Sequence, residues 1–150
     1  MSKNAPPLAP EALHALAENL RVVGVKLRRR LREESNVGDF TPSQAQVLTL
    51  LERDGPATVT ALARAQGMRP QSMGEMLAAL KAAGFVNGAP DPNDGRQTVL
   101  SLTPAFRKKI KASRAAREDW LFRTIQSQFS ATEQQQLAIG VDLLKRLIDS

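Results

Sequence analysis

The sequence predicts a mainly helical fold that carries one small β-hairpin. Apolar residues recur at intervals of three and four residues in several long segments, a spacing typical of helices with one buried face. Within residues 58–103, two helical patterns separated by a glycine precede two short β-rich runs, which are joined by a loop of Pro, Asn, Asp and Gly. This stretch therefore reads as a helix-turn-helix followed by a hairpin, the components of a winged helix.

Size and composition narrow the classes of function. The 150 residues, 42% of them hydrophobic, suit one ordinary domain. Without cysteine, and with His14 as the single histidine, thiolate and multi-histidine metal sites are excluded, and no cofactor is expected. The N-terminus lacks a secretion-signal pattern and no apolar run approaches about 18 residues, so we expect a cytoplasmic protein without membrane contact.

The first helix is expected from Pro10 to about Glu34, after a flexible arm over residues 1–10 that contains three prolines. Its narrow apolar stripe suits packing on other helices. The stripe comprises Leu13, Leu16, Leu20, Val23, Leu27 and Leu31.

The second helix begins with a capping box, in which Thr41 is the N-cap and Gln44 the third helical residue, and it ends near Gly55. Its apolar residues Val47, Leu48, Leu50 and Leu51 indicate a buried helix.

The third helix is expected over residues 57–66, opening at Thr58 or Thr60, with Leu62 and Ala63 facing inward.

The fourth helix follows a tight turn at Gly67; Pro70 suits its first position, and Gly84 marks its end. Its apolar and polar residues fall on opposite sides, so one face anchors the helix and the other is available for contact. The apolar side holds Met73, Met76, Leu77 and Leu80, and the polar side holds Gln71, Ser72, Glu75 and Ala79.

The hairpin is predicted from the β-runs at residues 85–86 and 98–102, with a loop from Ala89 to Arg96. The loop tip offers one cation, Arg96, two residues after Asp94.

Two more helices are expected at the C-terminal end. Thr103 and Pro104 open one, and Ser130 with Glu133 forms the capping box of the other. Together with the first helix, they present more apolar surface than a three-helix unit can cover, so we expect a homodimer. The alternative is an intramolecular bundle that covers its own surface.

The net charge of +6 is concentrated in one region. Residues 56–111 carry eight Lys or Arg against three Asp or Glu, whereas residues 1–55 carry eight against seven and residues 112–150 five against five. A polyanion is the natural partner of such a surface, although excess basic residues also simply promote solubility.

These features resemble the multiple antibiotic resistance regulator (MarR) family of winged-helix transcription factors, over about residues 11–149. The residues that carry the resemblance are Leu62-Ala63, Met68 to Met73, Leu80 to Val86, Asp91 to Arg96 and Val99 to Thr103. The resemblance implies a single MarR-type domain over residues 11–150, with a winged helix at about 41–103 and dimerisation helices at about 11–34 and 103–149. It implies a homodimeric repressor on a palindromic DNA operator, with release by a small aromatic or phenolic effector.

The candidate DNA-binding residues suit these roles. Gln71 and Ser72 are suited to base edges in the major groove, and Gln71 can bind an adenine through two hydrogen bonds. Arg69 before Pro70 suits a phosphate or a guanine, and Glu75 either accepts from a cytosine or discourages indiscriminate binding.

In the hairpin, Arg96 is placed to enter a narrow minor groove, and the resemblance implies that Asp94 orients it through an ion pair. A pair that only stabilises the loop is the alternative. The sequence departs from the family where arginines are common, with Gly88 and Ala89 at the near base of the wing and Gln97 after Arg96. Affinity is therefore expected to depend more on the basic start of the following helix.

Two other classes of function were compared with this hypothesis. An enzyme is not expected, because no nucleophile elbow, Gly-rich phosphate loop or metal-ligand cluster is present. The alternative is sequence-indifferent binding to nucleic acid, of an architectural or RNA-associated kind. It has less support, because there is no tyrosine for base stacking and the phenylalanines fall on stripes expected to be buried.

Overall fold

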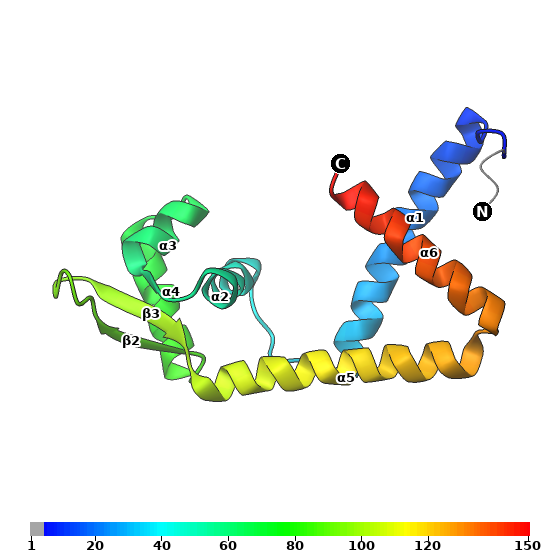
Figure 1. Ribbon diagram of the computed structural model, residues 1–150. Helices are drawn as coiled ribbons and strands as arrows, with labels where there is room; N and C mark the ends of the chain where they lie inside the picture. The colour runs from blue at the N-terminus through cyan, green and yellow to red at the C-terminus, as the bar shows by residue number, and fades with distance from the viewer. Residues whose placement is uncertain (1–4) are drawn as a thin grey trace. The chain divides into compact units, whose positions relative to one another are not determined.

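The computed structural model describes residues 5–150, which form six helices and three short strands (Figure 1). By their contacts, these residues divide into a central unit of residues 37–114 and a terminal unit of the described residues up to 36 together with 115–150. The expected N-terminal arm lies partly outside the described residues, and α1 begins at Pro10. The elements are α1 (Pro10–Glu34), α2 (Pro42–Asp54), β1 (Ala57–Thr58), α3 (Val59–Gln66), α4 (Pro70–Ala82), β2 (Val86–Pro90), β3 (Thr98–Leu102), α5 (Pro104–Gln128) and α6 (Ala131–Ile148).

Local capping fixes where α2 begins. The backbone N–H of Gln44 donates to the Thr41 hydroxyl at 3.2 Å, and the Gln44 side chain accepts from the Thr41 N–H at 3.0 Å. The predicted capping box is confirmed, and it satisfies two amide donors that the first turn would otherwise leave unpaired.

The turn between α3 and α4 is closed by backbone hydrogen bonds. Gly67 has φ +62°, a left-handed conformation that costs glycine little. The N–H groups of Gly67 and Met68 donate to the carbonyls of Arg64 and Ala63, at 3.3 and 2.9 Å. The chain then enters α4 at Pro70, as predicted.

The sheet differs from the prediction in two ways, the first at β1. Ala57 and Thr58 do not begin α3; they form a short strand that pairs with Leu100 and Val99 of β3. Thr58 then caps α3, because its hydroxyl accepts from the Ala61 N–H at 3.1 Å. The hairpin is thus part of a three-stranded antiparallel sheet of order β1-β3-β2.

The second difference concerns the hairpin loop. Ala89 and Pro90, predicted to lie in the loop, belong to β2 and pair with Val99 and Thr98. A proline is tolerated there because β2 is an edge strand, where a missing N–H costs no hydrogen bond within the sheet.

One hydrophobic core holds the central unit together. Its fully buried members include Val47 and Leu51 from α2, Met73 and Leu80 from α4, and Val86 from β2. Burying a side chain of this size stabilises a fold by about 1.5–3 kcal/mol. The predicted inward faces of α2, α3 and α4 are confirmed by the burial of these residues and of Leu62 and Ala63.

Three phenylalanines close the core at the start of α5. Phe85 lies between Phe40 and Phe106, with ring centroids 5.0 and 4.9 Å apart in edge-to-face arrangements. Beside them, the Thr103 hydroxyl donates to the Gly84 carbonyl at 2.8 Å and accepts from the Phe106 N–H at 3.1 Å. Thr103 therefore caps α5 and also ties it to the end of α4.

In the terminal unit, α1 is fastened to α5 at its C-terminal end. The Arg117 guanidinium donates to the backbone carbonyls of Leu31 and Ser35, at 3.1 and 2.8 Å. The Arg30 guanidinium lies 4.6 Å from the Trp120 ring centroid, a cation–π contact between the same two helices. The two Arg117 bonds satisfy carbonyls that the helix end would otherwise leave unpaired.

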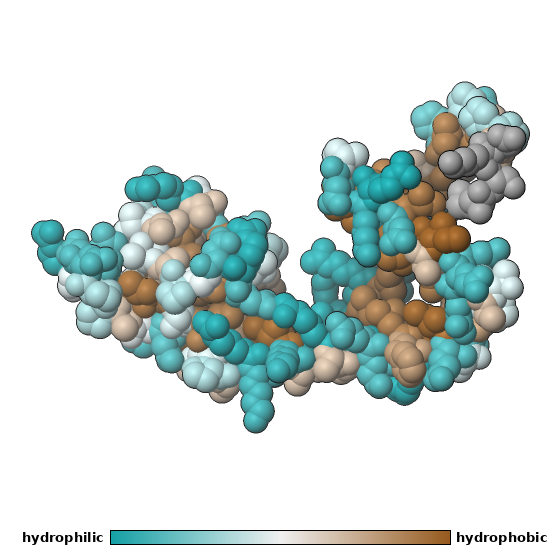
Figure 2. Space-filling view, in the orientation of Figure 1, coloured by the Kyte–Doolittle hydropathy of each residue, from teal (hydrophilic) through white to brown (hydrophobic). Residues whose placement is uncertain are grey.

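The apolar faces of the terminal helices are largely uncovered. Neither α1 nor α6 has a single buried residue. Leu13 and Val23 of α1 are 50% and 58% exposed, and Phe122 of α5 is 62% exposed. Figure 2 shows hydrophobic surface gathered on this unit. The expectation that the phenylalanines are buried is wrong for Phe122 and for Phe129, which is 38% exposed, because no other part of the described chain covers these two rings.

None of the helices in residues 5–150 combines the length and the apolar character needed to cross a bilayer.

Candidate nucleic-acid interface

The exposed face of α4 presents the side chains that the sequence analysis singled out. Gln71, Ser72 and Glu75 are exposed, whereas Met73 and Leu77 on the opposite side are buried. The buried residues fix the helix against the core, so the polar face is held by a rigid support. None of the three polar side chains bonds to another part of the described chain.

The N-terminus of α4 is left open. Thr41, Thr58 and Ser130 cap α2, α3 and α6 through side-chain hydrogen bonds, but Arg69 at the corresponding position of α4 makes none. The backbone N–H groups of the first turn therefore point outward without a side-chain acceptor. Such groups, together with the helix dipole, favour an anion such as a phosphate.

Arg69 and Pro70 begin this open end. Arg69 is exposed and makes no ion pair within residues 5–150. Pro70 occupies the first helical position, where its ring fixes the backbone and its missing N–H removes no helical hydrogen bond. The guanidinium is thus available to an external anion next to the uncapped turn.

The tip of the wing holds Arg96 in a defined orientation. One carboxylate oxygen of Asp94, Oδ1, accepts from the Arg96 backbone N–H at 3.1 Å and from its Nε at 3.2 Å. The Arg96 side chain nevertheless remains 93% exposed, against 37% for Asp94. The ion pair between the two residues is therefore present, and the guanidinium still has donors for a partner.

Further bonds support the turn that carries Arg96. The Asp91 carboxylate accepts from the Asn93 N–H, the Asp91 N–H donates to the Gln97 carbonyl, and the Gln97 N–H donates to the Asp94 carbonyl, each at 2.9 Å. The supporting roles of Asp91 and of the Gln97 backbone were not predicted from the sequence. The Asp-x-Asn spacing could have indicated the first of these bonds, because an aspartate commonly accepts from the N–H two residues later.

The base of the wing leaves little room for a side chain at position 88. A Cβ added at Gly88 would lie 3.0 Å from the Thr98 methyl carbon, on the strand paired with it. An arginine at position 88 would therefore have to displace Thr98.

The start of α5 carries a cluster of exposed cations, whereas the wing base carries none. Lys108, Lys109 and Lys111 are exposed and without ion pairs among residues 5–150. Arg107 donates to the Leu102 carbonyl at 3.4 Å, which holds its side chain near the end of β3.

The structure places all the candidate residues on the surface of the central unit, on two elements. Arg69, Pro70, Gln71, Ser72 and Glu75 lie on the first turns of α4, and Asp94 and Arg96 lie in the turn between β2 and β3. Within the described residues, no group of three or more His, Cys, Asp or Glu side chains could hold a metal ion.

Known proteins resemble this chain in sequence. A sequence profile described as the MarR family matches residues 39–97. An uncharacterized HTH-type transcriptional regulator of Mycobacterium bovis is 35% identical over 134 residues, which cover 89% of this chain and 93% of the relative.

Solved structures share the fold. The crystal structure of a putative transcriptional regulator from Pseudomonas aeruginosa superposes with a TM-score of 0.73 at 32% identity, covering 95% of this chain and 99% of that one. A mutant of MepR from S. aureus bound to an oligodeoxyribonucleotide gives a TM-score of 0.65 at 21% identity, covering 88% and 97%.

Proposed function

The chain belongs to the MarR family of transcriptional regulators, and from this membership we propose that it binds double-stranded DNA at a palindromic operator as a homodimeric repressor. One observation carries the proposal. The first turns of α4 expose Gln71 and Ser72 beside an uncapped helix N-terminus, while Met73 anchors the opposite side of the helix. A helix of this kind fits the major groove, where base edges offer donors and acceptors.

In this proposal the residues of α4 divide the recognition between them. Gln71 reads an adenine through its amide, and Ser72 contacts a neighbouring base. Glu75 lies one turn further along the exposed face and selects against bases that present an acceptor to it. Arg69 and the uncapped amides bind the flanking phosphate and set the register of the helix.

The wing supplies a second contact. Arg96, oriented by Asp94, enters the minor groove next to the half-site, where a narrow groove concentrates negative potential. The lysines at the start of α5 add contacts to the phosphate backbone. The wing base, which has Gly88 and Ala89, offers no cation for such contacts.

The uncovered apolar faces support the homodimer. They occur on α1, α5 and α6, and they include Ile148, which is 79% exposed. A monomeric soluble protein rarely leaves such contiguous apolar surface in water. Two-fold pairing buries both copies of the same surface at once.

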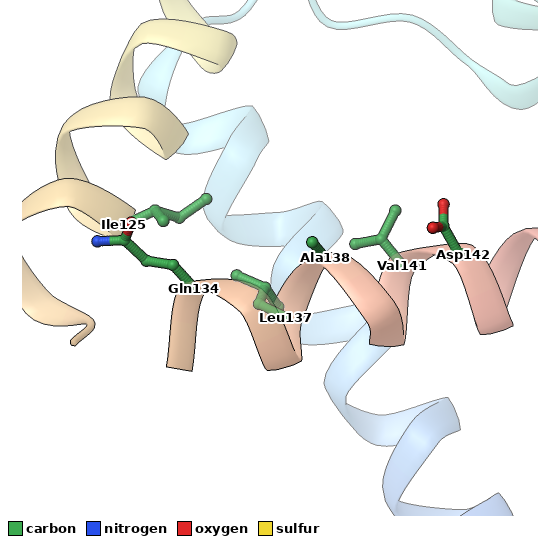
Figure 3. A pocket seen from close by; sticks show the side chains of 6 residues that line it. All are labelled: Ile125, Gln134, Leu137, Ala138, Val141 and Asp142. Carbon is green, nitrogen blue, oxygen red and sulfur yellow. The ribbon is translucent and has the colours of Figure 1, made fainter. Parts of the chain in front are cut away.

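A hollow between α5 and α6 has a mostly apolar lining, and an apolar side chain of a partner would fit into it (Figure 3). Ile125, Leu137, Ala138 and Val141 form its apolar part. Gln134 and Asp142 lie at its margin (Figure 3). We assign this hollow to the dimer interface.

The two alternatives to sequence-specific regulation are an enzyme and a protein that binds nucleic acid without regard to sequence. The relatives are transcriptional regulators and not enzymes. Sequence-indifferent nucleic-acid binding, architectural or RNA-associated, has one feature in its favour, because Phe122 is exposed. That ring lies in the terminal unit, outside the basic surface of the central unit, so we favour operator binding.

Binding measurements separate these two functions. DNA fragments selected by the protein from genomic DNA would provide the operator, and affinity would be measured for it and for a scrambled duplex at two salt concentrations. A sequence-specific regulator is expected to prefer the operator by about a thousandfold or more. Equal affinities would overturn the proposal.

Repression, the cytoplasmic location and release by a small aromatic or phenolic effector follow from the family resemblance. A reporter gene behind the selected operator tests the first. Expression is expected to rise when the gene for this chain is deleted. If expression falls, the protein is an activator.

An effector is identified when a candidate compound weakens operator binding and the operator in turn weakens binding of that compound to the same extent.

A further inference from the structure

We propose that Arg64 of α3 is an additional phosphate-binding residue, which contacts the DNA backbone beside the groove that α4 enters. This inference rests on the proposed function and extends it to a second helix. Arg64 belongs to a stretch of the chain that contains no carboxylate. From Gly55 to Gly74 the only charged residues are Arg64 and Arg69. The charged side chains of α3 and of the first turn of α4 are therefore all positive, and the first carboxylate after them is Glu75.

Arg64 lies on the outward side of α3. Leu62 and Ala63 are buried, and Gln66 points toward α2, where its side chain donates to the Ser43 carbonyl at 3.4 Å. Arg64 itself is exposed and has no ion pair within residues 5–150. Its side chain therefore has no structural role in the core of the central unit.

A rigid turn links Arg64 to the proposed recognition helix. The Arg64 carbonyl accepts from the Gly67 N–H, and the preceding carbonyl, of Ala63, accepts from the Met68 N–H. α3 also packs directly on α4. Arg64 and Arg69 thus stand at the two ends of one closed turn. The turn therefore fixes the Arg64 backbone close to that of Arg69, and in this proposal both guanidinium groups reach phosphates along the border of the groove that α4 enters.

Several other arginines of the described chain, unlike Arg64, form an ion pair with a carboxylate. Arg53 bonds to Asp54, Arg114 to Glu52 and Arg123 to Asp119. A carboxylate beside an arginine offsets part of the positive charge that the arginine offers to a phosphate. Arg64 has no such pair to break, so phosphate binding there gains the full release of counterions from the DNA.

The expected contact is with a phosphate and carries no base preference. Residues of the helix before a recognition helix cross the backbone and not the base edges. Arg64 therefore sets how firmly the helix-turn-helix is seated on DNA. It should add affinity to every sequence by the same factor.

The test compares Arg64→Ala with wild type on the selected operator and on a scrambled duplex, at four salt concentrations. Affinity is expected to fall by about 3- to 30-fold on both, and the magnitude of the salt slope by about one unit for each subunit bound. Lys26→Ala is the control, because Lys26 is an exposed cation of α1 without an ion pair in the described chain. Lys26→Ala should leave the slope unchanged.

Arg64→Lys distinguishes loss of charge from loss of fold. It should restore the salt slope, because a lysine binds phosphate as a point charge. If Arg64→Ala leaves the slope at the wild-type value while wild type still prefers the operator, Arg64 is only a solvated surface charge and the inference is wrong. If wild type itself shows no preference, the proposed function fails instead.

Discussion

At the scale of single residues, Gln71 is the side chain most directly tied to sequence recognition. Its amide has both a donor and an acceptor, and it is exposed on the first turn of α4. Replacement by alanine is expected to cost about 1–3 kcal/mol on the preferred operator, because a bidentate contact to one base is lost. Binding to an operator already changed at that base pair should be nearly unaffected.

Titrations of Gln71→Ala against operators changed one base pair at a time would locate the contact. Ala79→Gln is a suitable control, because position 79 lies on the same exposed side of α4, two turns further from its N-terminus. A uniform loss over all operators would mean that Gln71 contributes stability or backbone contacts and does not read a base.

Arg96 is expected to behave in the opposite way. Arg96→Ala should weaken binding to all sequences and lower the magnitude of the salt slope by about one unit for each subunit bound, because each wing loses a cation. Asp94→Asn should cost less, since the guanidinium remains and only its orientation by Asp94 Oδ1 is weakened. Affinities measured over a range of salt concentrations check both. An unchanged slope in Arg96→Ala would place the wing away from the DNA.

The sequence predicted the residues of α4 well, because alternation of apolar and polar side chains at helical spacing decides which of them are buried. Met73 and Leu77 are buried, and Gln71 and Ser72 are exposed, as that spacing requires. It could not predict why position 88 is glycine. A side chain at this position would crowd the methyl group of Thr98, ten residues away and on another strand, so the space available there depends on the register of the hairpin.

At the scale of elements, Thr103 ties the start of α5 to the segment between α4 and β2. Its hydroxyl caps α5 and bonds to the Gly84 carbonyl, and its N–H donates to the Phe85 carbonyl at 3.0 Å. Thr103→Val keeps the shape but removes both hydroxyl bonds, and it should lower the free energy of unfolding by about 1–3 kcal/mol. Thr103→Ser keeps the hydroxyl and should remain close to wild type. Urea unfolding measures the difference, and equal losses in the two variants would show that the methyl group matters and not the hydroxyl.

Helix boundaries were predictable wherever a capping residue is followed by proline or glutamate, as at Thr41 and Ser130. The strand β1 was not predictable. Two residues are too few for a pattern, and Ala57 and Thr58 become a strand only because β3 lies beside them. Likewise, the place of Pro90 in β2 depends on that strand being at the sheet edge, which a sequence does not state.

At the scale of the whole molecule, the proposed homodimer depends on the apolar faces of the terminal unit. Leu144→Glu introduces a charge on the apolar face of α6, where the leucine is 39% exposed. Burying two unpaired carboxylates in a two-fold interface should raise the dimer dissociation constant by about 100-fold or more. Operator affinity should fall with it, because each half-site must then be bound separately.

Sedimentation velocity with wild type, Leu144→Glu and the control Gln135→Glu checks this prediction. Gln135 is exposed on the polar side of α6, so the control variant adds the same charge away from the apolar face. Three equal sedimentation coefficients, all of a single chain, would show that the apolar faces have another partner.

The sequence predicted that these faces exceed what a three-helix unit can cover, but it left open whether the chain folds back over them. The structure favours a partner, since no residue of α1 or α6 is buried within the described chain. Spacing of leucines shows which side of a helix is apolar. It does not show what covers that side, because the covering atoms come from residues far away in the chain or from another copy.

Hydroxyl-radical footprinting of wild type on its selected operator tests the central claim most directly, namely that two copies of α4 read two half-sites. The expected footprint is two protected patches on one side of the duplex, with centres about 34–36 Å apart, or about one helical turn. A single patch, or unbroken protection without a repeat, would contradict it.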